Sequence, residues 1–159
     1  MRLGSETNMR SNELSMQEKF EGWIAEHNEY FRTVGSMQIT YQREVRVSEI
    51  SRIADFLLKQ ENKLINVELK TNPSMILMQQ LIDHSHYCDY SFALVPDFCL
   101  IPRWFIEKMT EKGFGLIIYN YRKEIFTEAL PAFVNKERDI KVKKKYIGKF
   151  KTEQLKLIM

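Results

Sequence analysis

Residues 52–70 read RIADFLLKQENKLINVELK, and this stretch contains two short apolar runs separated by polar residues. Residues 52–58 and residues 64–69 are both rich in aliphatic and aromatic side chains, and each run has the length of a β-strand. The polar residues 60–63 between them are too few to form a helical crossover, so the two strands are expected to pair as an antiparallel hairpin.

The sequence before this hairpin predicts one more strand and a helix. Residues 38–47 alternate in side-chain character with the period of two that is typical of a strand. From Asn12 to about Arg32 apolar side chains recur every three or four residues, as in an amphipathic helix that Ser11 or Asn12 can cap. The apolar face of this helix is expected to hold Leu14, Phe20, Trp23, Ile24, His27 and Phe31.

The sequence after the hairpin continues with elements typical of an α/β protein. Pro73 can open a helix that runs to about Tyr87, and residues 91–95 follow as a strand. The step through this helix allows a right-handed parallel crossover, so a mixed sheet is expected. Further expected elements are a helix at 102–112, a strand at 114–119 and a hairpin partner at 125–128. The core side of the Pro73 helix is expected to hold Met75, Ile76, Leu77, Met78, Leu81 and Ile82.

The composition is that of one folded domain. The chain has 159 residues, of which 44% are hydrophobic and 28% are charged, which excludes a wholly disordered or fibrous protein. Its apolar runs are too short to span a membrane, and the polar residues 1–15 do not resemble a signal peptide. The two cysteines, Cys88 and Cys99, form no disulfide pattern, so we expect an intracellular, reducing compartment.

Charge is unevenly distributed along the chain. Residues 136–159 carry nine basic and three acidic side chains, whereas residues 1–135 carry 15 basic and 18 acidic side chains. A basic segment with aromatic side chains can attract a polyanion, although such a charge run is more often a solvated face. The expected organisation is a flexible N-terminus at 1–11, a folded domain at 12–135, and a basic segment that packs on or extends that domain.

Three charged residues interrupt the apolar strands of the hairpin, namely Asp55, Glu68 and Lys70. A charge inside a buried strand is costly unless it is paired or bound to a metal. Glu68 and Lys70 are two residues apart and therefore point to the same face of the sheet, and the hairpin brings Asp55 alongside them. Two carboxylates and one ammonium are thus expected to converge at one edge of the sheet.

This arrangement suits a hard divalent cation. Carboxylate and backbone carbonyl oxygens suit Mg²⁺, which keeps several waters and accepts phosphate oxygens into its shell. A bound divalent ion lowers the pKa of a water and neutralises charge on a phosphodiester, and Lys70 can stabilise the transition state. The alternative is a structural ion pair between Lys70 and either Asp55 or Glu68, and the spacing alone leaves both open.

The order and spacing of these residues resemble the PD-(D/E)xK nuclease superfamily. Asp55 lies on one strand, and after twelve intervening residues Glu68, Leu69 and Lys70 form the ExK motif on the next. The likeness covers residues 12–97, well over half of the chain. It implies a restriction-endonuclease-like core of order αβββαβ, with a mixed central sheet flanked by helices.

A narrower likeness lies further along the chain. Residues 86–98, HYCDYSFALVPDF, and residues 113–120, GFGLIIYN, look like the corresponding parts of the MmcB-type DNA-repair nuclease family. One position departs from the superfamily pattern, because Ala54 rather than proline precedes Asp55.

The resemblance implies roles for the matching residues. Asp55 and Glu68 would bind Mg²⁺ or Mn²⁺, with the Leu69 carbonyl as a third ligand and Lys70 as the catalytic lysine. Members often add a glutamate from the first helix, for which Glu13 is preferred to Glu18 and Glu21. They also add a glutamine from the helix after the lysine, for which Gln80 is preferred to Gln79.

The segment at residues 83–89, Asp-His-Ser-His-Tyr-Cys-Asp, has the composition of a metal-ligand cluster. Zinc needs three or four ligands in fixed geometry, and no second His or Cys pair follows in the sequence. We therefore expect a helix end, with His86 and Cys88 partly in the core and Asp89 beginning a turn.

These observations predict a Mg²⁺- or Mn²⁺-dependent deoxyribonuclease that hydrolyses phosphodiester bonds in DNA repair, recombination or mobile-element defence. We expect it in the cytoplasm, associated with the nucleoid, with DNA as substrate, no membrane partner and a homodimer as one possible assembly. The alternative is a non-catalytic nucleic-acid-binding or partner-binding module with the same fold. Three arginines of the expected strands would contact phosphates near a site or else occupy solvated strand edges: Arg43, Arg46 and Arg52.

Overall fold

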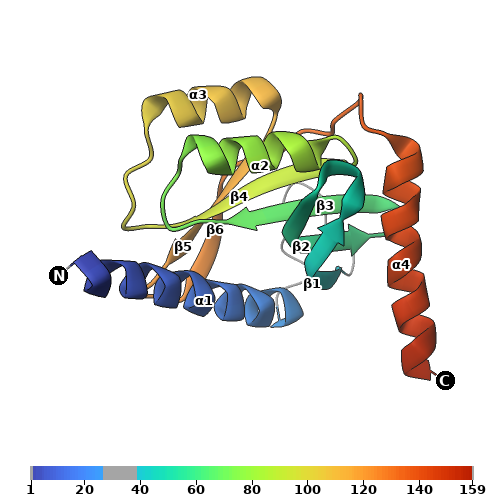
Figure 1. Cartoon of the computed structure of the whole chain (residues 1–159), viewed down its shortest axis with the longest axis horizontal. Coiled ribbons are helices and arrows are strands. Elements are labelled where there is room, and N and C mark those ends of the chain that lie inside the picture. The colour runs from blue at the N-terminus through green and yellow to red at the C-terminus, as the bar shows by residue number, and fades with distance from the viewer. Residues whose placement is uncertain (1, 27–38, 159) are drawn as a thin grey trace.

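The computed structural model describes residues 2–26 and 39–158, with side chains at 12–26 and 39–150 (Figure 1). Two expected members of the first helix, His27 and Phe31, lie outside the described residues. The described residues form α1 (Arg2–Glu26), β1 (Thr40–Val47), the short 3-10 helix η1 (Ser48–Ile50), β2 (Arg52–Gln60), β3 (Lys63–Leu69), α2 (Met75–Ser85), β4 (Tyr90–Pro96), α3 (Arg103–Lys112), β5 (Gly115–Asn120), β6 (Ile125–Leu130) and α4 (Ile140–Ile158).

The strands form one mixed sheet in the order β1-β2-β3-β4-β5-β6. β1, β2 and β3 are an antiparallel meander, β3, β4 and β5 are parallel, and β6 returns antiparallel to β5. The expected α/β class, the hairpin at residues 52–70 and the parallel crossover through α2 are therefore confirmed.

Helices cover both faces of the sheet (Figure 1). α1 lies along one face, α2 and α3 lie on the other, and α4 stands at one end of the sheet. On the α1 side, Phe20 packs edge-on against Phe56 of β2, with ring centroids 5.1 Å apart. On the other side, buried side chains of α2 and α3 such as Leu81 and Phe105 pack on Ala93 and Val95 of β4.

The buried faces of α1 and α2 differ from the expected ones near the positions where the two helices were expected to begin. Leu14 is 58% exposed, and Met16 takes the buried place because it is spaced by four and eight residues from Phe20 and Ile24. α1 also begins at Arg2 rather than at Asn12, since a helix continues through polar residues that need no buried face.

The first turn of α2 differs in the same way. Met75 and Ile76 are 66% and 65% exposed, whereas the buried side chains Leu77 and Leu81 recur every four residues. The hydroxyl of Ser74 accepts a hydrogen bond from the backbone N–H of Leu77 at 3.4 Å, so it caps the helix directly after Pro73. The first two apolar side chains of α2 therefore lie on its solvent side and do not contribute to the core.

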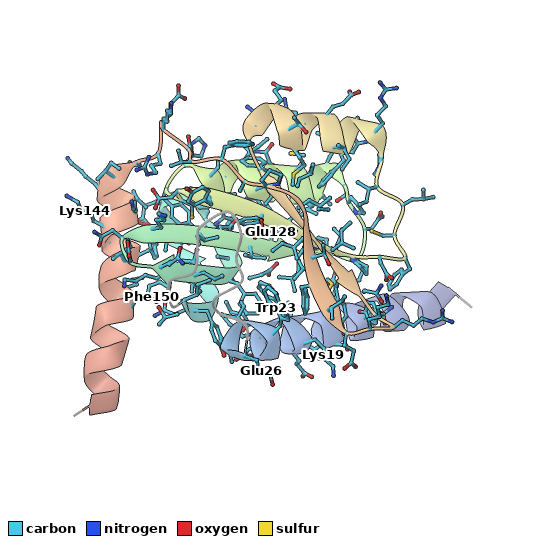
Figure 2. The ribbon with its side chains drawn as sticks, turned by 180° about the vertical axis from the view of Figure 1, so that it is seen from behind. Lys19, Trp23, Glu26, Glu128, Lys144 and Phe150 are labelled. Carbon is cyan, nitrogen blue, oxygen red and sulfur yellow. The ribbon has the colours of Figure 1, made fainter. Side chains whose placement is uncertain are left out.

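The basic C-terminal segment forms α4, which packs against the sheet through one face. Tyr146, Ile147 and Phe150 are buried there, and Figure 2 shows Phe150 directed at the strands and Lys144 directed away. None of the helices among residues 2–26 and 39–158 is long and apolar enough to cross a lipid bilayer.

Glu49 in η1, which connects β1 and β2, forms a hydrogen bond and an ion pair with α4. Its Oε1 accepts a hydrogen bond from the Tyr146 hydroxyl at 2.6 Å, and its Oε2 lies 2.8 Å from the Lys145 ammonium. The Lys145 ammonium and then the Tyr146 hydroxyl lower the pKa of Glu49 from 4.5 to about 2. The carboxylate therefore stabilises the fold above about pH 4.5, and this contribution is lost as the pH falls toward 2.

Glu49→Gln is accordingly expected to lower the melting temperature at pH 7 by about 2 °C, a modest shift because the pair faces solvent. The difference between variant and wild type should disappear as the pH falls toward 2, as followed by circular dichroism at a series of pH values. The matched control is Glu61→Gln in the exposed β2–β3 turn, which should leave the melting temperature unchanged. A Glu49→Gln effect that is constant from pH 7 to pH 2 would contradict the role of the charge.

Candidate functional site

The two acidic residues of the hairpin meet where β2 and β3 separate. The last regular pair at this end of the hairpin is Phe56 with Val67. Asp55 and Glu68 are the next residue on each strand beyond that pair. The backbone N–H of Asp55 donates to Glu68 Oε1 at 3.3 Å, and the backbone N–H of Leu69 donates to Asp55 Oδ2 at 2.9 Å. Each carboxylate thus reaches across to the other strand, and the expected convergence of the two acids is present.

The environment of this pair disfavours two negative charges. Glu68 is 1% exposed and Asp55 is half-buried. Burial raises the pKa of Glu68 well above its ordinary range, and the neighbouring Asp55 carboxyl raises it further. Asn66 opposes this shift, because its Nδ2 donates to Glu68 Oε1 at 2.8 Å. A bound cation would remove the cost of ionising both acids.

Lys70 does not neutralise the acids through an ion pair. It is half-buried at the end of β3, and its backbone N–H donates to the Leu94 carbonyl at 3.1 Å. Within the described part of the chain its ammonium forms no ion pair with Asp55, Glu68 or any other acid. The strand-end ion pair that the spacing left open is therefore not the reason for these charges.

Glu13 of α1 reaches the same end of β3. Its Oε1 lies 3.4 Å from the backbone nitrogen of Thr71, the residue after Lys70. Among the other first-helix glutamates, Glu21 binds Arg43 at 2.7 Å and Glu18 is exposed. Among the α1 glutamates whose side chains are described, Glu13 is thus the one that binds the residue directly after the ExK motif.

The two glutamines of α2 have different surroundings. Gln79 is exposed and donates to Asp83 at 2.9 Å. Gln80 is half-buried, lines a cleft beside β2, and its buried Oε1 has no hydrogen-bond partner among the described residues. Of the two glutamines, Gln80 is therefore the one that lines the cleft and keeps an unsatisfied side-chain oxygen.

His84 contacts the site and was not expected from the sequence. It is fully buried, and its Nε2 lies 3.2 Å from Glu68 Oε1 without the alignment of a hydrogen bond. Its Nδ1 lies 2.5 Å from the Tyr87 hydroxyl. Burial lowers the pKa of His84 to about 4, so the ring is neutral at pH 7. The sequence feature that could have indicated this contact is the helical spacing of His84, which lies four residues after Gln80 and seven after Leu77 on the buried face of α2.

The remaining residues of the 83–89 segment do not form a metal site. His86 is exposed rather than partly in the core, because it follows the last turn of α2, whereas Cys88 is fully buried. Asp89 is also buried, directly before β4, and it binds Arg138 and Lys143 rather than beginning an open turn.

The acid pair fits a hard divalent cation such as Mg²⁺. Among the side chains at residues 12–26 and 39–150, no three from His, Cys, Asp or Glu form a group that could share a metal. Mg²⁺ needs only one or two carboxylates, because it retains waters and takes substrate phosphate oxygens. Asp55, Glu68 and the Leu69 carbonyl would therefore be the oxygen ligands for such an ion, whereas zinc would require more nitrogen or sulfur ligands.

Comparison with known proteins gives no relative from which a function could be inferred. No family model matches the chain, and neither the curated proteins nor the solved structures contain a match.

Proposed function

We propose that the chain is a Mg²⁺- or Mn²⁺-dependent nuclease that hydrolyses DNA phosphodiester bonds. The observation that carries the proposal is the pair of cross-strand hydrogen bonds from the Asp55 N–H to Glu68 Oε1 and from the Leu69 N–H to Asp55 Oδ2. Lys70, which forms no ion pair among the described residues, follows directly after β3. Among the described residues, the buried Glu68 lies beside a second acid and a neutral histidine and has no charged basic partner, an arrangement that is unfavourable for folding alone and favours a functional reason for it. The resemblance of the Asp55 and ExK spacing to PD-(D/E)xK nucleases supports the same reading.

Each residue has a distinct task in this proposal. Asp55, Glu68 and the Leu69 carbonyl would hold the ion, which when bound supplies positive charge beside a phosphodiester and a water of lowered pKa. Lys70 holds the attacking water or stabilises the charge that develops on the phosphoryl oxygens. Glu13 of α1 and Gln80 of α2 would complete the site from the two helices beside it.

The chemical step is hydrolysis of one phosphodiester. The water oxygen forms a bond to phosphorus, the bond from phosphorus to the 3′ oxygen breaks, and that oxygen leaves and takes up a proton. The products are a 5′-phosphate and a 3′-hydroxyl. Lys70 acts by charge and hydrogen bonding from its position directly after Glu68 and Leu69.

The test is a panel of labelled DNAs and RNAs, comprising duplex, single-stranded, nicked, flap and junction forms, incubated with Mg²⁺, Mn²⁺ or EDTA. We expect DNA cleavage with either metal and none in EDTA. Lys70→Ala should lose cleavage, whereas the matched β3 variant Lys63→Ala should keep it. Absence of cleavage on every form by a folded wild type would contradict the proposal, and binding without cleavage would favour the non-catalytic module.

A further inference from the structure

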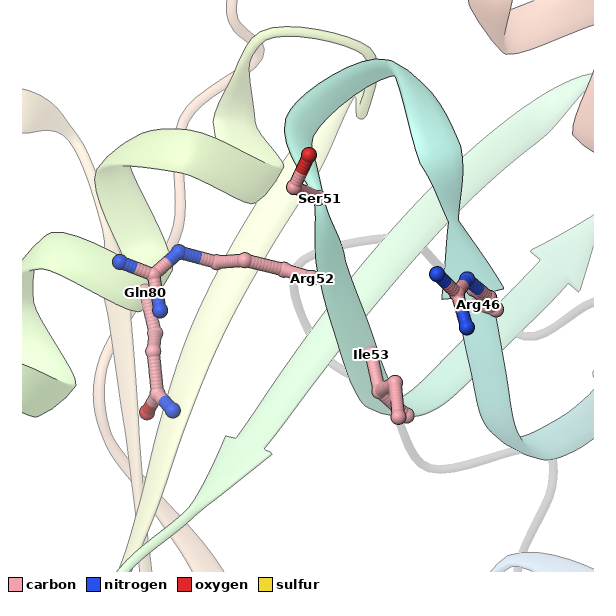
Figure 3. Close-up of a pocket in the computed structure, with 5 residues that line it drawn as sticks. All are labelled: Arg46, Ser51, Arg52, Ile53 and Gln80. Atoms are coloured by element: carbon pink, nitrogen blue, oxygen red, sulfur yellow. The ribbon is translucent and has the colours of Figure 1, made fainter.

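A cleft of about 430 Å³ lies between the β1–β2 hairpin and α2. Figure 3 shows Arg52 reaching from β2 toward α2, Gln80 on the helix side, and Arg46 across from them on β1. The cleft is lined by Arg46, Ser51, Arg52, Ile53 and Gln80.

The polar groups of this cleft suit an anion. Arg52 is fixed in place because its Nε lies 2.5 Å from Asp83 Oδ2, which leaves the rest of its planar guanidinium for a ligand. Arg46 is exposed and forms no ion pair within the described ranges, so its charge is fully available. Ser51 adds a hydroxyl donor, whereas the buried Oε1 of Gln80 is an acceptor and does not contribute to anion binding.

The cleft adjoins the acid pair. Ile53 precedes Asp55 by two residues on β2, so both side chains are on the same side of the strand. Gln80 precedes His84 by one turn of α2, and His84 contacts Glu68. An anion in the cleft would therefore lie on the same surface of the protein as the two carboxylates and next to them.

We propose that this cleft binds a backbone phosphate of the nucleic-acid strand next to the phosphodiester that is cleaved, with Arg46 and Arg52 as its main ligands. The inference rests on the proposed nuclease function. The two guanidinium groups offer several N–H donors in the planar arrangement that phosphate accepts. Such a contact positions the strand over Asp55 and Glu68 without reading its sequence.

The experiment measures the dissociation constant of fluorescent DNA by anisotropy in EDTA, which prevents cleavage, at several NaCl concentrations. Arg46→Ala is expected to weaken binding by about tenfold and to reduce the slope of log affinity against log salt by about 1. Arg52→Lys keeps a positive charge beside Asp83 but loses the planar fork, so binding should weaken by a smaller factor with an unchanged slope. The matched control is Arg103→Ala on α3, a fully solvated arginine that should bind like wild type.

Inorganic phosphate is added in a second series, because a site for free phosphate would use the same chemistry. If inorganic phosphate binds wild type but not Arg46→Ala, while DNA binds the two proteins equally in phosphate-free buffer, the cleft takes free phosphate only and the inference is wrong. Equal affinity and slope for Arg46→Ala and Arg103→Ala would also overturn it, even if wild type cleaves DNA. A wild type that binds DNA through Arg46 but cleaves nothing would support the cleft and overturn the nuclease.

Discussion

Glu68→Gln is expected to reduce Mg²⁺-dependent DNA cleavage by about 1,000-fold or more. The amide has the shape of the acid but cannot carry the negative charge that a divalent cation requires beside Asp55. The measurement is the single-turnover cleavage rate of the best DNA from the substrate panel. Asp55→Asn should lose a similar factor, and the control Glu61→Gln, at the far end of the same hairpin, should cleave like wild type. A Glu68→Gln rate within tenfold of wild type would remove Glu68 from the site.

Thermal unfolding separates lost chemistry from lost folding in the same variant. In EDTA, Glu68→Gln should melt about 2–5 °C above wild type, because it removes a buried acid whose pKa is raised by burial and by Asp55. In Mg²⁺ the wild type should gain stability by binding the ion, and the variant should not. An inactive variant that is unfolded in both conditions would say nothing about metal binding, in which case Asp55→Asn provides the same comparison at a half-buried position.

The hairpin and its acids could be predicted because they depend on local patterns. Two apolar runs joined by a short polar turn can only pair in an antiparallel manner, and strand alternation then fixes which residues share a face. The opposition of Asp55 and Glu68 follows from that register without knowledge of the rest of the chain. The same holds for the α2 crossover, whose length and apolar content are visible in the sequence.

The contacts that the sequence did not reveal join segments that are far apart. His84 reaches Glu68 because α2 packs on β3, and nothing local distinguishes it from a core histidine. The exposed Leu14, Met75 and Ile76 have apolar side chains that fit a helical spacing, but their exposure depends on where each helix crosses the sheet. The burial of Asp89 could not be predicted for the same reason, because the sequence shows only that it follows a helix and its ionic partners lie far along the chain.

Asp89 is a buried hub between the start of β3 and the segment that leads into α4. Its Oδ2 accepts the backbone N–H of Leu64 at 2.7 Å, and its own N–H donates to the Leu64 carbonyl at 2.8 Å. The Lys143 ammonium lies 2.9 Å from Oδ2, and the Arg138 guanidinium contacts Oδ1. One carboxylate therefore forms ion pairs with two cations and satisfies a strand N–H at a site that is 2% exposed.

Asp89→Ala is consequently expected to lower the free energy of unfolding by about 3 kcal/mol, because it leaves two partly buried cations without their counter-charge and one buried N–H without an acceptor. Chemical denaturation with urea measures the loss, and limited proteolysis should cut between residues 135 and 143 earlier than in wild type, since Asp89 holds that segment. Asp97→Ala, at an exposed aspartate after β4, is the matched control and should change stability by less than about 0.5 kcal/mol. Equal stability of the two variants would mean that the buried packing of Tyr146 and Phe150, rather than the Asp89 ion pairs, attaches α4 to the sheet.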